Sequence, residues 1–328
     1  MRVGRYIVYG AGGIGASLGA QLHRAGQDVV LIARGDQLAA LREKGLEYAT
    51  PEGRARLALP VVGHPDEVGF RVGDAVILAV KTQHSLSAIE ALAGVAGPDL
   101  TLLCAQNGVE NERLAQRRFR RVIGLAVWIP ASFIDPGVVL NYAPHAPIEL
   151  GCVPAGIDAL ARSVEQDLRA AGFAAKARED VLAWKYAKLL TNAVSTLDAI
   201  CGGRAGLDDV WARIKEEGAA CYRAAGIATV PAAEYEARVA FAISAMGEID
   251  GVPRSGGSST QSLARGQGSI ETDYINGEIV RLGRAFGVAT PVNEAIQQAA
   301  NELAAKPRAH PLTADQLRAR IDDRAHKQ

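Results

Sequence analysis

The chain has 328 residues, which suits about two domains of ordinary size. Its 36 lysines and arginines balance its 36 aspartates and glutamates, so bulk charge indicates no nucleic-acid or membrane-surface partner. No apolar run approaches the roughly 18 residues of a membrane span. Four scattered cysteines without a paired motif predict free thiols in a reducing cytoplasm, and neither they nor the histidines show the spacing of a metal site.

The N-terminal segment predicts a dinucleotide-binding unit. Residues 5–9 (RYIVY) are typical of a buried strand, and the glycine-rich GAGGIG follows at 10–15. A helix then runs to Gly26, and a second strand is expected at 28–34. The spacing G-x-G-x-x-G is weak evidence alone but specific between a strand and a helix. A glycine-rich turn without a ligand is the structural alternative.

Each glycine of this motif has its own physical reason. Gly10 permits the tight turn, Gly12 leaves room for a pyrophosphate, and Gly15 lets the helix lie close to the strand. The N–H groups at the start of the helix then face the anion. The loop residues predicted to bind the cofactor are Gly10, Ala11, Gly12, Gly13, Ile14 and Gly15.

The end of the second strand favours NADP(H) over NAD(H). NAD enzymes usually place an acidic residue there to bind the ribose 2′-hydroxyl, whereas this strand ends in Ala33 and Arg34. A guanidinium suits the 2′-phosphate of NADP(H). The alternative is a solvated arginine at a strand end, because arginine is common on surfaces.

Two further apolar segments end in polar residues. Strands are predicted at 73–80, followed by Lys81, and at 100–108, which ends in QNG with Asn107. Open α/β sheets bind ligands at the carboxyl edge, where both segments end. We therefore expect Lys81 to support the adenosine phosphates and Asn107 to reach the nicotinamide ribose or the substrate.

The sheet is expected to continue beyond these strands. Residues 120–129 and 146–151 predict a partly antiparallel extension, with the short segment 139–143 between them. A helix is predicted at 158–172, ending at a glycine.

Helical patterns replace strand signals after about residue 180. The fold class predicted is α/β, with an N-terminal Rossmann-type doubly wound sheet over residues 1–178 and an all-helical C-terminal domain over 179–328. The catalytic cleft is expected between the two. Residues 253–269, rich in glycine and serine, indicate either a flexible loop or an anion pocket.

Residues 184–196 (WKYAKLLTNAVST) predict a core helix that carries two lysines. Lys188 and Asn192 are four residues apart and share a helix face, which Ser195 and Thr196 extend. Taken alone, Lys188 is typical of a lysine that extends along the surface to reach solvent. Lys185, one turn earlier, is interpreted as a residue at the rim of the site.

Several motifs in order resemble the ketopantoate reductase family, also called the 2-dehydropantoate 2-reductases, from residue 5 to about 300. They are GAGGIG, Arg34, AVKT at 79–82, QNG at 106–108, WKYAKLLTN at 184–192 and ETDYING at 271–277. The resemblance implies a Rossmann domain before a helical one and NADPH-dependent reduction of a 2-keto acid to a 2-hydroxy acid in pantothenate biosynthesis. It also allows a homodimer through the helical domain.

The resemblance implies roles for individual residues. Lys188 matches the catalytic lysine, Asn192 its partner, and Glu271 the acid that binds the substrate. Ser259 and Asn107 match a serine that holds the substrate carboxylate and an asparagine shared by cofactor and substrate. The residues matching those that recognise the NADPH phosphates and adenosine are Arg34 and Lys81.

The chemistry of ketone reduction explains the lysine. Hydride delivery to a ketone leaves an alkoxide, which must be protonated or stabilised as it forms. A lysine does both, and desolvation moves its pKa from about 10.4 toward the useful range for acid catalysis. Glu271 then either binds a substrate hydroxyl or keeps Lys188 charged.

The sequence departs from the family where the substrate is expected. Ser195 and Thr196 stand where a second asparagine is common, and residues 255–270 differ from the usual pattern around Ser259. Ser195 is therefore counted among the candidate substrate-binding residues. The alternatives are a relative that reduces another keto acid or carbonyl compound, and a non-catalytic NADP-binding regulator.

Overall fold

The computed structural model describes residues 2–203, 205–254, 256–264, 269–306 and 310–326. It divides into two compact units. The first unit comprises Met1–Lys185 and Val230–Arg254, and the second comprises Tyr186–Thr229 and Ser255–Gln328. Among the described residues, every strand lies in the first unit, whereas the second is helical.

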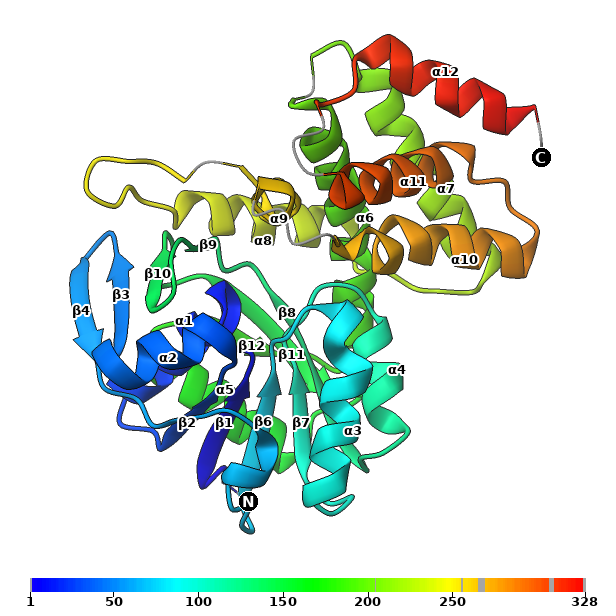
Figure 1. The fold of residues 1–328 in the computed structure, drawn as a ribbon. Coiled ribbons are helices and arrows are strands. Elements are labelled where there is room, and N and C mark those ends of the chain that lie inside the picture. The colour runs from blue at the N-terminus through cyan, green and yellow to red at the C-terminus, as the bar shows by residue number, and fades with distance from the viewer. Residues whose placement is uncertain (1, 204, 255, 265–268, 307–309, 327–328) are drawn as a thin grey trace. The chain divides into compact units, whose positions relative to one another are not determined.

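The first unit is built around an eight-stranded sheet (Figure 1). In spatial order its strands are β12 (Ala174–Ala177), β11 (Pro147–Cys152), β8 (Arg121–Val127), β7 (Thr101–Cys104), β6 (Asp74–Leu78), β1 (Arg5–Tyr9), β2 (Val29–Ile32) and β5 (Val61–Val62). The six strands from β8 to β5 are parallel, while β11 runs antiparallel to β8. The doubly wound α/β fold and its antiparallel extension are confirmed.

Residues 139–143 lie between β8 and β11 in the chain, but those two strands pair directly with each other. The segment instead contributes β10 (Val138–Asn141) to a second sheet, whose other strands are β4 (Gly53–Leu57), β3 (Leu46–Thr50) and β9 (Ala131–Phe133). This second sheet packs on α1 (Gly13–Arg24), so Val139 is buried against that helix's apolar cluster.

Helices cover both faces of the large sheet, as parallel strands require. Successive side chains of β1 point to opposite faces, so Tyr6 and Val8 pack with α1 and α5 (Ala159–Ala170), while Ile7 packs on the other side. That other side is covered by α3 (Ser85–Val95) and α4 (Glu110–Gln116) (Figure 1). Helix α2 (Gly35–Lys44) contacts β5.

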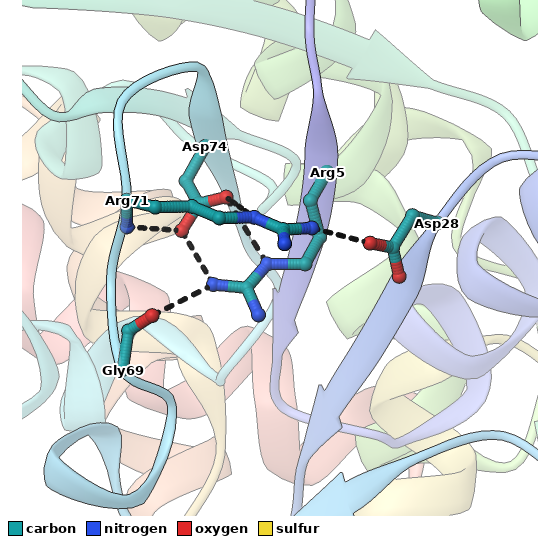
Figure 2. Close-up of polar contacts among 5 residues, drawn as sticks. All are labelled: Arg5, Asp28, Gly69, Arg71 and Asp74. Atoms are coloured by element: carbon teal, nitrogen blue, oxygen red, sulfur yellow. Dashed lines mark hydrogen bonds and ion pairs between the residues drawn. The ribbon is translucent and has the colours of Figure 1, made fainter.

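Charged side chains join the amino ends of three strands (Figure 2). Arg5 on β1 binds both oxygens of the buried Asp74 on β6, with N···O distances of 3.1 and 2.6 Å. Arg71 donates its backbone N–H to Asp74 at 2.9 Å and its guanidinium to Asp28, next to β2, at 2.6 Å. Bidentate arginine–carboxylate pairs have a defined geometry, so this cluster fixes the register of β1 and β6 at their amino ends.

The unit boundary differs from the predicted one at residue 178. Helix α8 (Ala232–Ser244), expected in the helical domain, belongs to the first unit. Its Arg238 binds Glu149, a fully buried carboxylate on β11 that Arg178 also contacts at 2.5 Å. A buried carboxylate needs such partners, and this charge pairing explains why α8 stays with the sheet.

The second unit packs its helices around α7 (Asp208–Ala224), α10 (Asn276–Phe286) and α11 (Pro291–Ala305). Helix α6 (Val181–Cys201) crosses the division, and only its residues from Tyr186 belong to this unit. The remaining elements are α9 (Ser258–Ala264), the 3₁₀ turn η3 (Glu271–Tyr274) and α12 (Ala314–Ala325). Gly218 lets α6 lie close to α7, because a Cβ there would lie 2.3 Å from Leu190 Cδ2.

All four cysteines lie among the described residues and carry free thiols. In those residues, no helix combines the length and apolar character that crossing a membrane requires. Nor does the described part of the chain group three His, Cys, Asp or Glu side chains so that they could hold a metal ion.

Candidate active site

The glycine-rich loop joins β1 to α1 at the point where the strand order reverses. The chain passes from β1 to β2 on one side, while β6 lies on the other, and such a point forms a crevice in open α/β sheets. Gly10 has φ 104°, and a Cβ there would lie 2.7 Å from Val80 N. A Cβ on Gly15 would lie 2.1 Å from Gly10 O, so a side chain at either position would clash with the backbone.

Gly12 has a different environment from its two neighbours in the motif. A Cβ built on it would meet nothing within 4 Å. Gly12 is also the N-cap of α1, which has no side-chain cap and no acidic residue in its first turn. Uncapped N–H groups beside open space are what a pyrophosphate needs, so this loop fits a dinucleotide. Gln37 steadies it by donating to Ala11 O at 2.7 Å.

The two candidate phosphate-binding cations follow neighbouring strands. Arg34 is exposed directly after β2, at the N-cap of α2. Burial raises the pKa of Tyr9 at the end of β1, and the nearby positive charge of Arg34 opposes that shift. Lys81 is half-buried beyond β6, two residues after Ala79, whose N–H donates to Tyr9 O at 2.8 Å. Arg34 and Lys81 thus follow strands on either side of β1.

Asn107 lies just beyond β7 and contacts a buried polar network of Ser85, Gln106 and Asn111. This network was not predicted from the sequence. Its carbonyl oxygen accepts from Asn111 Nδ2 at 3.2 Å. Ser85 Oγ donates to Asn111 Oδ1 at 2.6 Å and accepts from Gln106 Nε2 at 3.0 Å. The residues of this network are buried, and their local sequence carries no motif that would have revealed it.

Lys185 belongs to this network, and its interpretation as a rim residue is wrong. The residue is only 3% exposed. Its Nζ forms an ion pair with the buried carboxylate of Glu112 and donates to Gln106 O at 3.1 Å. A lysine is tolerated in the interior when a carboxylate and a carbonyl satisfy its ammonium group, which replaces the hydration it loses.

In the second unit, α6 presents three polar side chains at four-residue intervals. Lys188 and Asn192 are half-buried, and Thr196 is fully buried. Asn192 Nδ2 and Thr196 Oγ1 are buried atoms without a hydrogen-bond partner in the described part of the chain. Such buried groups can form a hydrogen bond with a polar ligand or a water molecule. Ser195 instead donates its hydroxyl to Thr191 O on the same helix, at 3.2 Å.

The segment that carries Glu271 is linked directly to α6. Asn276, the asparagine of the ETDYING motif, is fully buried and donates to Ala193 O at 3.2 Å and to Asn293 Oδ1 at 3.1 Å. Thr272 Oγ1 donates to Asn276 Oδ1 at 3.4 Å. The structure therefore brings the start of α10, which directly follows η3 in the chain, against the turn of α6 that follows Asn192.

A second link holds α11 in the same cluster. Glu217 on α7 accepts the N–H groups of Val292 and Asn293 at 2.9 Å each, and Asn293 Nδ2 at 2.7 Å. These donors belong to the first turn of α11, where a carboxylate is favoured. Burial raises the pKa of Glu217, and the N–H donors oppose the shift.

Ser259 lies on α9, within the segment 253–269 whose alternatives were a loop and an anion pocket. It is 7% exposed, and α9 packs against α11. Part of the segment is thus helical, while Ser255 and residues 265–268 lie outside the described residues.

Replacing Asn276 with leucine should lower both stability and turnover. The change removes the donor to Ala193 O and leaves a buried carbonyl without it, a loss of about 1–3 kcal/mol in the free energy of unfolding. Urea denaturation and steady-state kinetics measure the two effects. Asn301→Ala, which removes an exposed bond to Asp273, is the control and should leave both nearly unchanged. A stability loss with full turnover would show that the link does not position α6.

Comparison with known proteins adds independent information. The family model described as Ketopantoate reductase PanE/ApbA matches residues 6–155, and its C-terminal counterpart matches 180–304. A 2-dehydropantoate 2-reductase of Archaeoglobus fulgidus is 31% identical over 305 residues, covering 90% of this chain and 96% of that protein. One of Mycobacterium tuberculosis is 28% identical over 293 residues, covering 88% and 93%.

Solved structures show the same fold. A PanE/ApbA family ketopantoate reductase from Ralstonia eutropha has a TM-score of 0.78 at 26% identity, covering 93% of this chain and all of that one. D-mandelate dehydrogenase, solved with NADH and anilino(oxo)acetate, has the same TM-score at 23% identity, covering 91% of this chain and 98% of that one.

Proposed function

Because the chain belongs to the ketopantoate reductase family, we propose that it reduces a 2-keto acid related to 2-dehydropantoate with NADPH. Membership makes it an oxidoreductase with a nicotinamide cofactor. The observation that carries the substrate proposal is the α6 face of Lys188 and Asn192, where a buried amide donor without a partner among the described residues lies one turn beyond a lysine.

The residues proposed to bind the cofactor all belong to the first unit. The loop from Gly10 to Gly15 holds the pyrophosphate on the uncapped start of α1, as the open position of Gly12 supports. Arg34 binds the 2′-phosphate, and Lys81 supports the adenosine phosphates. Asn107 contacts the nicotinamide ribose and the substrate. NADPH, when bound, supplies the hydride that adds to the carbonyl carbon.

The substrate residues supply the proton and orient the keto acid. Lys188 donates a proton from Nζ to the carbonyl oxygen, so that the ketone becomes a hydroxyl group as its carbon gains the hydride. Asn192 donates its unpartnered N–H to the substrate. Ser259 contacts the substrate carboxylate, Ser195 is a further substrate contact, and Glu271 accepts a hydrogen bond from a substrate hydroxyl.

A substrate panel tests this proposal directly. Purified protein is mixed with NADPH and, in turn, 2-dehydropantoate, other branched or hydroxylated 2-keto acids, aromatic 2-keto acids and simple ketones, and the fall in NADPH absorbance is followed. We expect turnover with hydroxylated 2-keto acids. NADPH binding without turnover of any compound would favour the regulator instead. The homodimer that the family resemblance allows is tested by molar mass in solution.

Replacing Arg34 with alanine should weaken NADPH binding roughly 10- to 150-fold, the worth of a charged hydrogen bond of about 1.5–3 kcal/mol. NADH lacks the 2′-phosphate, so its affinity should change little. Fluorescence titration with both cofactors measures the ratio. Arg42→Ala is the control, because that exposed arginine on α2 pairs with Glu67 at 3.2 Å. Equal weakening of the two cofactors would argue against a 2′-phosphate contact.

A further inference from the structure

The buried pair of Lys185 and Glu112 has no role in the mechanism above. Lys185 lies near the start of α6, Glu112 lies on α4, and both belong to the first unit. Their side chains are 2% and 1% exposed. Replacing such a pair by apolar side chains of similar volume often leaves stability unchanged or improves it, so stability alone gives no reason for a charged pair here.

The pair also contacts the backbone just beyond strand β7, through the carbonyl oxygen of Gln106. Strand β7 ends at Cys104, and Ala105 N still donates to Leu78 O of β6 at 3.0 Å. Gln106 lies beyond the ladder, so its carbonyl oxygen needs another donor. Lys185 Nζ supplies it at 3.1 Å, and Glu112 holds the ammonium group in place from the other side.

The next carbonyl along the chain is held as well. Asn107 O accepts from Asn111 Nδ2 at 3.2 Å, and Gly108 then turns the backbone with φ 77°. The peptide groups on both sides of the Asn107 Cα are thus held by side chains from α6 and α4. Fixing these two groups fixes the backbone torsions of Asn107 and with them the direction of its side chain.

We propose that the Lys185–Glu112 pair is a positioning device for Asn107, and that it sets the amide which, under the proposed function, contacts both cofactor and substrate. The inference rests on that function for its kinetic consequence only. Lys185 is therefore a positioning residue, in contrast to Lys188 three residues later on the same helix.

A mutant cycle tests the route through Asn107. Lys185→Met combined with Glu112→Leu removes the pair without leaving a buried charge, and we expect it to fold and to lose about tenfold or more in kcat/KM through misplacement of Asn107. In an Asn107→Ala background the same double change should alter kcat/KM less than about twofold, because groups that act through one residue are not additive. Fully additive losses would overturn the proposal.

A second measurement does not depend on activity. Hydrogen exchange of the backbone at 105–111, measured without ligand, should be faster in the pair variant than in the wild type. Glu112→Gln, a milder change that keeps an acceptor for Lys185, should raise the exchange rate less. Unchanged exchange in both variants would overturn the positioning role.

The matched control is the buried pair of Arg5 and Asp74, which lies at the amino ends of β1 and β6 (Figure 2). The Lys185–Glu112 pair lies instead beyond the carboxyl end of β7. Arg5→Met with Asp74→Leu removes a pair of similar burial, with side chains 11% and 1% exposed. It should leave both exchange at 105–111 and kcat/KM within about twofold of the wild type, as expected for distant sites. If the wild type reduces no 2-keto acid, the proposed function fails, whereas the exchange comparison still decides the positioning role.

Discussion

Replacing Lys188 with alanine should yield a folded protein that binds NADPH and has lost roughly 100- to 10,000-fold in kcat, the usual contribution of a positioned general acid. The residue is half-buried on a continuous helix, so truncating it should leave α6 intact. Asn192, one turn on, retains its unpartnered donor for substrate binding, so KM should change less than kcat.

The control for this experiment is Lys215→Ala. Lys215 is a half-buried lysine of the same unit whose Nζ lies 3.7 Å from the centre of the Trp211 ring. Its loss should affect stability but leave kcat near the wild-type value. Thermal denaturation confirms folding of both variants, and steady-state kinetics with saturating NADPH give kcat. Wild-type turnover by the Lys188 variant would remove this lysine from the mechanism.

Replacing Gly12 with valine should abolish NADPH binding, with at least a 100-fold rise in Kd, while the protein stays folded. The backbone at Gly12 has φ −86° and ψ −164°, which valine adopts without strain. Its side chain would extend into the open space beside the first turn of α1, where the pyrophosphate is proposed to lie. Titration with NADPH measures Kd, and thermal denaturation measures folding.

Gly15→Ala is the matched comparison from the same motif. Its Cβ would lie 2.1 Å from Gly10 O and 3.0 Å from Val8 Cγ1, so the helix and strand must separate. This overpacking should lower the free energy of unfolding by about 1–3 kcal/mol or more. If the folded Gly12 variant bound NADPH as tightly as the wild type, the loop would not be the cofactor site.

Much of the first unit could be predicted because its signals are local. The strands predicted at 5–9, 28–34, 73–80, 120–129 and 146–151 are short apolar runs, and all are present. The glycine loop was also predictable, since a tight turn, a close helix and a positive φ each require glycine at a fixed offset from the strand.

Pairing partners were not predictable in the same way. The local pattern of β10 indicates a strand, but its assignment to the second sheet depends on α1, which needs a cover on its outer side. The place of α8 in the first unit depends likewise on Glu149, a buried carboxylate that requires Arg238 from 89 residues later. Such choices follow from long-range burial, which local periodicity does not contain.

The two lysines of α6 also show the difference between what the local sequence indicates and what long-range contacts decide. By itself the sequence determined the helix, the four-residue spacing of Lys188 and Asn192, and the motifs that place the chain in its family. Only the tertiary structure decided that Lys185 is interior, because its burial depends on Glu112, 73 residues earlier in the chain. A charged side chain is buried only where the fold places a partner that can pair with it.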